Sequence, residues 1–251
     1  MNQILVTKKL YITPELKKKK KAYKFYFFLS VFLVFALISV YIYAEVDRNK
    51  SEETSHAILA EFNQDLDDNT TADENVLIAV LNADPGEETD INTEYALNQS
   101  QKTANRNKVY TTNNGYNYST IATINIPKIN VNYPILDGQT DSVEETEYLL
   151  KISPIKFWGA NPNEVGNFCI VGHNYRDTRF FSKVLTLENG DIIEITDDTG
   201  RTLKYSVYDK YEVNPDDTSC TSQLTDGRKE ITLITCTNDS KLRVIVKAKE
   251  V

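Results

Sequence analysis

The segment KEITLITCTNDSKLRVIVKAKE, residues 229–250, contains the pattern that decides the fold. Two runs rich in β-branched residues, 230–235 and 242–249, are separated by a short polar stretch that is typical of a turn. We therefore predict two neighbouring strands that fold back on each other. This arrangement places Cys236, at the end of the first strand, beside Arg243, at the start of the second.

The same pattern, runs of β-branched residues separated by turn signals, extends upstream to about residue 116. The pairs Asn189-Gly190 and Thr199-Gly200 mark turns between the runs. Pro127 and Pro134 interrupt the first two runs, which predicts edge or bent strands there because proline cannot donate a ladder hydrogen bond. The further strand candidates are residues 119–126, 131–137, 167–171, 191–196 and 201–213.

The density of these runs indicates the fold class. With the C-terminal pair they give seven strand candidates within residues 116–251. We therefore predict a mainly β fold, a closed or nearly closed, antiparallel-rich β-barrel of about seven or eight strands. Residues 142–150 and 216–224 are expected to be short helices, the second opened by Asp216, which is suited to capping.

Charge divides the chain into three parts, although its net charge is −8. Residues 1–24 carry eight lysines against one acid, and residues 45–105 carry 15 acids against three basic residues. The remaining part is nearly balanced. The only basic run borders an apolar segment, which is typical of a topology signal, so we expect no nucleic-acid partner.

The apolar segment, residues 25–44, has 20 residues without a charge, and a helix of that length spans about 30 Å of hydrocarbon. Its 13 Phe, Leu, Ile and Val residues favour insertion by about 5 kcal/mol. A cleaved signal peptide is the rival interpretation, but the segment is long for one and no clear cleavage site follows. We predict one N-terminal transmembrane helix that contacts the bilayer, with residues 1–24 cytoplasmic and residues 45–251 extracellular.

Residues 45–115 are rich in Asp, Glu, Asn, Thr and Ser. Their two apolar clusters, 57–62 and 76–81, are too short to form stable helices alone. We predict an acidic extracellular stalk, partly helical or disordered, with a turn at residues 84–86. The expected division is therefore a basic tail (1–24), a signal-anchor helix (25–44), the stalk (45–115) and the barrel domain (116–251).

Three cysteines without a CxxC spacing argue against a disulfide framework and against a thioredoxin-like site. Cys169 lies inside an apolar run and is expected in the core, and Cys220 is given no role. The only histidines, His56 and His173, lie far apart, so a zinc site is not expected, and His56 is expected to be solvated. We expect neither a cofactor nor a metal.

Cys236, His173 and Arg243 each lie at the end of a predicted strand. An imidazole can activate a thiol and later protonate a leaving amine, and a planar guanidinium can meet the charge that develops on a carbonyl oxygen. Each residue alone has an ordinary explanation: a small buried group, a turn cap and an exposed strand position. Together they suggest acyl transfer through a thioester.

At these residues the sequence resembles the sortase family. Residues 232–236, Thr-Leu-Ile-Thr-Cys, match the Thr-Leu-x-Thr-Cys signature of sortases, and residues 172–174, Gly-His-Asn, match the segment that carries the family's histidine. Arg243 matches the arginine on the following strand, and the order His, Cys, Arg is the family's order. Residues 124–129 and 133–136 also resemble the first strands of sortases.

The resemblance, over about residues 116–251, implies a sortase-like barrel and a membrane-anchored transpeptidase. Sortases cleave a Leu-Pro-x-Thr-Gly-like sorting signal between Thr and Gly and hold the acyl part as a thioester. By this likeness Cys236 attacks, His173 is acid and base, Arg243 orients the substrate and oxyanion, and Thr235 lines the cleft. The implied partners are surface proteins that carry the signal and an amine of a peptidoglycan precursor or a pilin.

The subclass and the alternatives stay open at this point. The compact domain and the Ile-Pro-Lys-Ile segment favour class D, whereas Gly-His-Asn and the long segment 144–162 are similar to class B. Gly86 follows Asp84-Pro85 where a pilin-type lid has an aromatic residue, so the stacking plug is missing. The alternatives are a non-catalytic extracellular binding module on the same barrel and a general cysteine protease.

Overall fold

The computed structural model describes residues 14–81, 108–112, 114–140 and 142–251, and for residues 68–81 only the backbone. Contacts divide the chain into two units, Met1–Asn49 and Lys50–Val251. The turn expected at residues 84–86 lies outside the described residues.

Helix α1, Pro14–Leu81, begins in the first unit. Among the described residues it is the one helix that is long and apolar enough to cross a membrane, judged by length and composition. Its Phe, Leu and Ile side chains are exposed from Phe25 to Ile42. This exposed apolar surface agrees with the membrane-spanning segment expected at residues 25–44.

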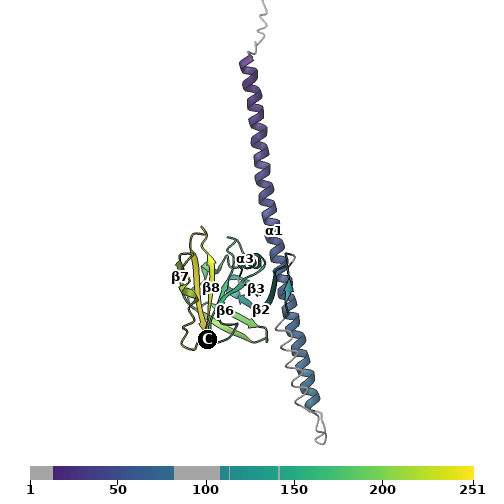
Figure 1. Cartoon of the computed structure of the whole chain (residues 1–251), viewed down its shortest axis with the longest axis vertical. Coiled ribbons are helices and arrows are strands. Elements are labelled where there is room, and N and C mark those ends of the chain that lie inside the picture. Colours follow the sequence, from purple (N-terminus) through teal and green to yellow (C-terminus); the bar gives the residue numbers. More distant parts are fainter. Residues whose placement is uncertain (1–13, 82–107, 113, 141) are drawn as a thin grey trace, which may run out of the picture. The chain divides into compact units, whose positions relative to one another are not determined.

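The second unit contains a closed β-barrel of eight strands, as predicted (Figure 1). The neighbours follow the order β2-β3-β4-β5-β8-β9-β7-β6, and β6 pairs with β2 to close the ring. The short strand β1 is added beside β2. The bounds are β1 Tyr110–Thr111, β2 Asn117–Ile126, β3 Val131–Gly138, β4 Ile155–Gly159, β5 Gly166–Val171, β6 Ile192–Asp197, β7 Thr202–Val213, β8 Lys229–Cys236 and β9 Arg243–Glu250.

Strand β8 is buried on both faces. Ile231 and Leu233 point into the barrel core, while Ile234 packs in a second apolar cluster on the outer face with Cys169 and Cys220. Successive side chains of a strand point to opposite faces, so Thr232, Ile234 and Cys236 share the outer face. The nucleophile candidate therefore belongs to the face that the loop before β8 partly covers.

Short helices connect the strands, and one of them was expected. Helix α3, Val143–Ile152, begins after Ser142, whose side chain accepts a hydrogen bond from the Glu145 backbone N–H. The helix expected over residues 216–224 is wrong, because only the 3-10 turn η3, Ser219–Thr221, forms there. The carbonyls of that segment instead accept hydrogen bonds from Asn167 of β5. The other 3-10 turns are η1, Pro127–Ile129, and η2, Val184–Thr186.

The two prolines lie where the ladder is interrupted. Pro127 starts η1 directly after β2. Pro134 lies within β3, whose pairing with β4 consists only of Leu136 opposite Ile155. A missing N–H is tolerated there because the strand lacks a full second neighbour. The sequence did not predict β4, whose Phe157 and Trp158 are both exposed and give no alternating pattern.

The helical part of the expected stalk is packed against the barrel within the second unit. Leu59 and Phe62 are buried, and Ser55, fully buried, forms a 3.0 Å hydrogen bond with Ser153. Lys108 donates to Glu61 at 2.7 Å. Residues 50–67 therefore belong to the barrel unit by contact, which the sequence did not reveal. The fourfold division at residues 24, 44 and 115 stays a prediction.

Candidate functional site

The antiparallel pair β8–β9 brings Cys236 opposite Arg243, as expected from the sequence. Both residues are half-buried, and they are the last residue of one strand and the first of the next. The turn between them is closed by the Thr237 N–H, which donates to the Leu242 carbonyl at 3.0 Å. Backbone pairing thus holds the guanidinium residue beside the thiol residue, and no side-chain contact is needed for this.

The parallel pair β5–β8 brings the histidine to the same edge. Val171 lies opposite Ile234, and the Gly172 N–H donates to the Ile234 carbonyl at 3.1 Å. His173 and Cys236 each lie two residues beyond the paired Val171 and Ile234. The Asn174 amide donates to the Cys236 carbonyl at 2.9 Å and fastens the two strand ends together.

The loop that follows β5 closes tightly on itself. The Phe181 N–H donates to the His173 carbonyl at 3.1 Å, and Asn174 forms an isolated β-bridge with Phe180. A Cβ on Gly172 would approach the Phe181 ring to 2.6 Å, so only glycine fits at that position. The Tyr175 ring contacts the His173 ring at 5.3 Å between centroids. The imidazole is therefore carried by a loop with little freedom.

Burial lowers the pKa of His173 below its ordinary value of 6.5. Glu147 raises it and Lys151 lowers it, and both belong to α3. The lowered pKa favours the neutral form of the imidazole. A neutral imidazole can accept a proton from a thiol, which a protonated one cannot.

Thr235 differs from its expected place. Its side chain is only 1% exposed, and its hydroxyl donates to the Gly172 carbonyl at 2.8 Å. The sequence predicts Thr235 in the cleft, whereas the structure places it in the interior because it faces away from the outer side that carries Cys236. The hydrogen bond of Thr235 to Gly172 fixes the residue before His173.

The other two cysteines are buried. Cys169 is fully buried, as predicted, and Cys220 is 4% exposed. Burial raises the pKa of Cys169 to about 12 and also raises that of Cys220. Thiols in such surroundings are chemically inert. Cys236 is the one cysteine of the three with substantial exposure.

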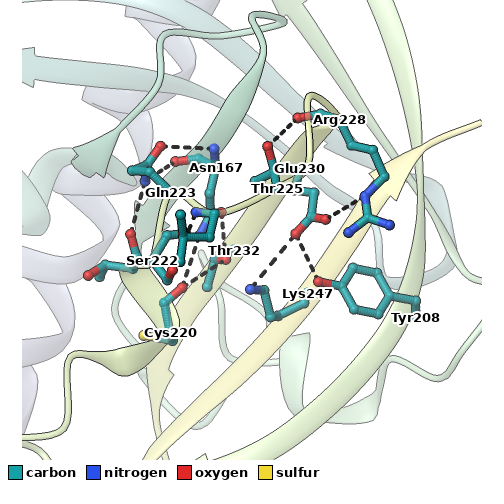
Figure 2. Close-up of polar contacts among 12 residues, drawn as sticks. Asn167, Tyr208, Cys220, Ser222, Gln223, Thr225, Arg228, Glu230, Thr232 and Lys247 are labelled. Carbon is teal, nitrogen blue, oxygen red and sulfur yellow. Dashed lines mark hydrogen bonds and ion pairs between the residues drawn. The ribbon is translucent and has the colours of Figure 1, made fainter.

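The loop between β7 and β8 is anchored to the outer face by buried Asn167 (Figure 2). Its side-chain N–H groups donate to the carbonyls of Cys220 and Ser222 at 2.9 and 3.1 Å. Its side-chain oxygen accepts from the Thr232 hydroxyl at 2.7 Å. The Gln223 side chain also binds the Asn167 backbone: its oxygen accepts from the Asn167 N–H, and its amide donates to the Asn167 carbonyl. No motif in the sequence indicated this anchor.

A second network surrounds Glu230, which is 5% exposed (Figure 2). Its carboxylate accepts from the Tyr208 hydroxyl at 2.9 Å and lies 3.2 Å from Arg228 and 3.8 Å from Lys247. Burial and the adjacent carboxylate raise the pKa of Tyr208 well above its usual range. These contacts hold the start of β8, six residues before Cys236.

The described part of the chain has no group of three or more His, Cys, Asp or Glu side chains placed to hold a metal ion. The strand pairings bring a thiol, an imidazole and a guanidinium to this edge of the barrel.

Comparisons with known proteins indicate the family of the chain. A family model described as Sortase domain matches residues 124–251. A search of curated proteins gave no match. Among solved structures, the chain is similar to a sortase D5 transpeptidase of Clostridium perfringens, with 32% identity over 61% of this chain and 88% of that chain, and a TM-score of 0.50. It is also similar to sortase C-1 of Actinomyces oris, with 28% identity over 52% and 73% of the two chains and a TM-score of 0.44.

Proposed function

Because the chain belongs to the sortase family, whose members are cysteine transpeptidases, we propose that it transfers surface proteins through a thioester on Cys236. The single observation that carries the proposal is the convergence of His173, Cys236 and Arg243 at one barrel edge through the β5–β8 and β8–β9 pairings. The expected class D character is consistent with the similarity to the sortase D5 transpeptidase.

In the first half-reaction His173 accepts the proton of the Cys236 thiol, and the sulfur attacks the carbonyl carbon of the scissile peptide bond. The carbonyl π electrons move to oxygen, and Arg243 stabilises the resulting negative charge. The intermediate then collapses and the C–N bond breaks. The leaving amine takes the proton from His173, and the acyl group remains on sulfur as a thioester.

In the second half-reaction an acceptor amine attacks the thioester carbon. His173 takes a proton from that amine, and Arg243 again faces the oxyanion. The C–S bond breaks, and the sulfur recovers its proton from the imidazolium. The balance is one peptide bond broken and one amide bond formed, so no further reactant is needed.

We propose a Leu-Pro-x-Thr-Gly-like sorting signal as acyl donor, and an amine of a peptidoglycan precursor or a pilin as acceptor. Val171, which is partly exposed and packs against the apolar cluster of the outer face, supports an acyl donor with apolar residues before the scissile bond. In this proposal Thr235 does not contact the peptide directly. Its hydroxyl holds the Gly172 carbonyl and thereby fixes the backbone that leads to His173.

We also propose that the chain is a single-pass membrane protein with residues 1–24 in the cytoplasm and the barrel outside. The lysine-rich tail before an apolar helix supports this orientation. Protease added to intact cells should remove the barrel and leave the tail protected. Protection of the barrel in intact cells, with digestion after lysis, would reverse the orientation.

The decisive experiment is intact-mass analysis of the full chain in detergent micelles after incubation with Leu-Pro-x-Thr-Gly peptides. A hydroxylamine-labile adduct is expected in the wild type and in Cys220→Ala, and is expected to be absent in Cys236→Ala. With a glycine-based amine added, the product should be an amide.

Other outcomes identify the alternatives. A free carboxylate in the presence of a good amine acceptor indicates a general cysteine protease. No adduct across a broad peptide library, together with a Cys236 that resists alkylation, indicates a non-catalytic binding module.

A further inference from the structure

Four aromatic contacts connect helix α1 with the candidate catalytic histidine. The His56 ring stacks on Tyr133 at 5.4 Å between centroids, and Tyr133 contacts Phe180 at 4.9 Å. Phe180 contacts Tyr175 at 5.6 Å, and Tyr175 contacts His173 at 5.3 Å. The rings form an unbroken series from the helix to the site.

The central part of this series is buried and held by a hydrogen bond from the same helix. Tyr133 is 3% exposed and Phe180 is 1% exposed. The Tyr133 hydroxyl donates to the Glu52 carboxylate at 3.2 Å. Glu52 and His56 are one helical turn apart, so a single face of α1 holds Tyr133 from two sides.

The far end of the series belongs to the closed loop that carries His173. Phe180 has a left-handed backbone, with φ of 46°, and bridges to Asn174, the neighbour of His173. A nonglycine residue with positive φ persists where its surroundings determine its position. A shift of Phe180 is therefore passed to the backbone of Asn174, directly after His173.

We propose that Glu52 and His56 are positioning residues, which hold the His173 imidazole in its working orientation through Tyr133 and Phe180. The inference rests on the proposed function, because it assumes that His173 exchanges protons with Cys236. It assigns the part of α1 that follows the apolar segment a role in positioning the catalytic group, in addition to its packing on the barrel.

Separate contacts fasten the helix to the barrel, so the positioning role can be tested by itself. Leu59 and Phe62 are buried one to two turns further along, Glu61 bonds Lys108, and Ser55 bonds Ser153. None of these contacts involves Glu52 or His56, so they should persist when either residue is changed. The helix should consequently stay docked while the ring series loses its support.

The test compares His56→Ala, Glu52→Gln and their double variant with Glu53→Gln in the full chain in detergent micelles. Glu53 is exposed and forms no hydrogen bond or ion pair with the described residues, so Glu53→Gln repeats the charge change without loss of a bond. The double variant should lower kcat about tenfold with KM and Tm little changed, since small misplacements of a catalytic group cost rate. His56→Phe, which keeps a stacking ring, should restore most of the loss in His56→Ala.

A second readout is the rate of Cys236 alkylation against pH, with His173→Ala as reference. If His173→Ala leaves both this profile and turnover unchanged, the proposed function itself fails. If His173→Ala changes them but the double variant matches Glu53→Gln, only the positioning role fails. A loss of turnover accounted for entirely by a lower Tm, with an unchanged alkylation profile, also overturns it.

Discussion

At the Lys229 end of β8 the buried polar side chains are bonded, whereas at the Cys236 end the three candidate catalytic side chains have no side-chain partner among the described residues. Asn167, Thr232 and Glu230 all have hydrogen-bond partners within the protein (Figure 2). Within the described residues, the side chains of Cys236, His173 and Arg243 form no hydrogen bond or ion pair with one another or with other side chains. The two ends are carried by the same pair of strands.

The difference assigns distinct tasks to the two ends. Buried polar groups that are fully bonded fix a unique arrangement, and the Asn167 and Glu230 networks fix the register of β5 and β8. Groups with unused bonding capacity can bind a peptide and its developing charge. Geometry at the reactive end is set mainly by backbone pairing, so the side chains there are free for chemistry.

The largest effect should follow from loss of the thiol. Cys236→Ala is expected to reduce acyl transfer by at least ~10⁴-fold because no other group can form the thioester. Tm should stay within a few degrees of the wild type because the side chain is half-exposed and no hydrogen bond within the described residues is lost. Turnover assays and thermal unfolding of the same samples check both expectations. Retained turnover would remove Cys236 from the site.

A change at Arg243 should come second. Arg243→Gln is expected to lower kcat about 10²- to 10³-fold, the usual cost of losing an oxyanion donor. Arg243→Lys should recover only part of this because an ammonium lacks the planar array of donors. Lys241→Gln, in the exposed turn before β9, is the matched control and should leave kcat unchanged. Equal losses in Lys241→Gln and Arg243→Gln would indicate a general electrostatic effect.

The opposite end of β8 should respond in stability. Asn167→Ala is expected to lower the free energy of unfolding by about 3 kcal/mol, since it leaves the Thr232 hydroxyl and two loop carbonyls without their partner. Gln223→Ala, whose side chain is exposed, should cost about 1 kcal/mol. Denaturant unfolding measures both. A larger loss for Gln223→Ala would mean that the loop, and not the buried amide, maintains the pairing.

The smallest effect concerns pH. Burial lowers the pKa of His173, so the unfolded chain binds this proton more readily than the folded chain. Stability from the neutral imidazole is present above the ordinary pKa of 6.5 and is lost as pH falls through that value toward the folded pKa. The wild type should lose more unfolding free energy between pH 7 and pH 5 than His173→Gln. Parallel curves would contradict the lowered pKa.

The barrel could be predicted from the sequence because its longer strands carry local patterns. The predicted strands 230–235 and 242–249 agree with β8 and β9 to within one residue, and Ser142 marked the start of α3. Strand β4 was missed because its exposed aromatic residues give no alternation. Its existence depends on pairing with β5, which no local pattern of residues 155–159 records.

The site was predictable in part for a similar reason. Cys236 and Arg243 are joined by a short turn, so their adjacency follows from two local strands. His173 was grouped with them as a third strand-end residue of suitable chemistry, and the family resemblance supported the grouping, because a parallel pairing between distant strands has no local signal. The Asn167 anchor and the packing of residues 50–67 escaped prediction, since both depend on contacts between segments far apart in the chain.

The parallel pairing of β5 with β8 also has a consequence for the order of folding. Asn174 and Cys236, which it joins, are 62 residues apart in the sequence. Contacts at such separations form slowly, because loop closure must precede any gain from pairing. A nascent or partly folded chain therefore carries only an ordinary thiol with no imidazole beside it. We therefore expect the thiol and the imidazole to meet late in folding, so that the proposed acyl transfer begins only once the barrel has closed.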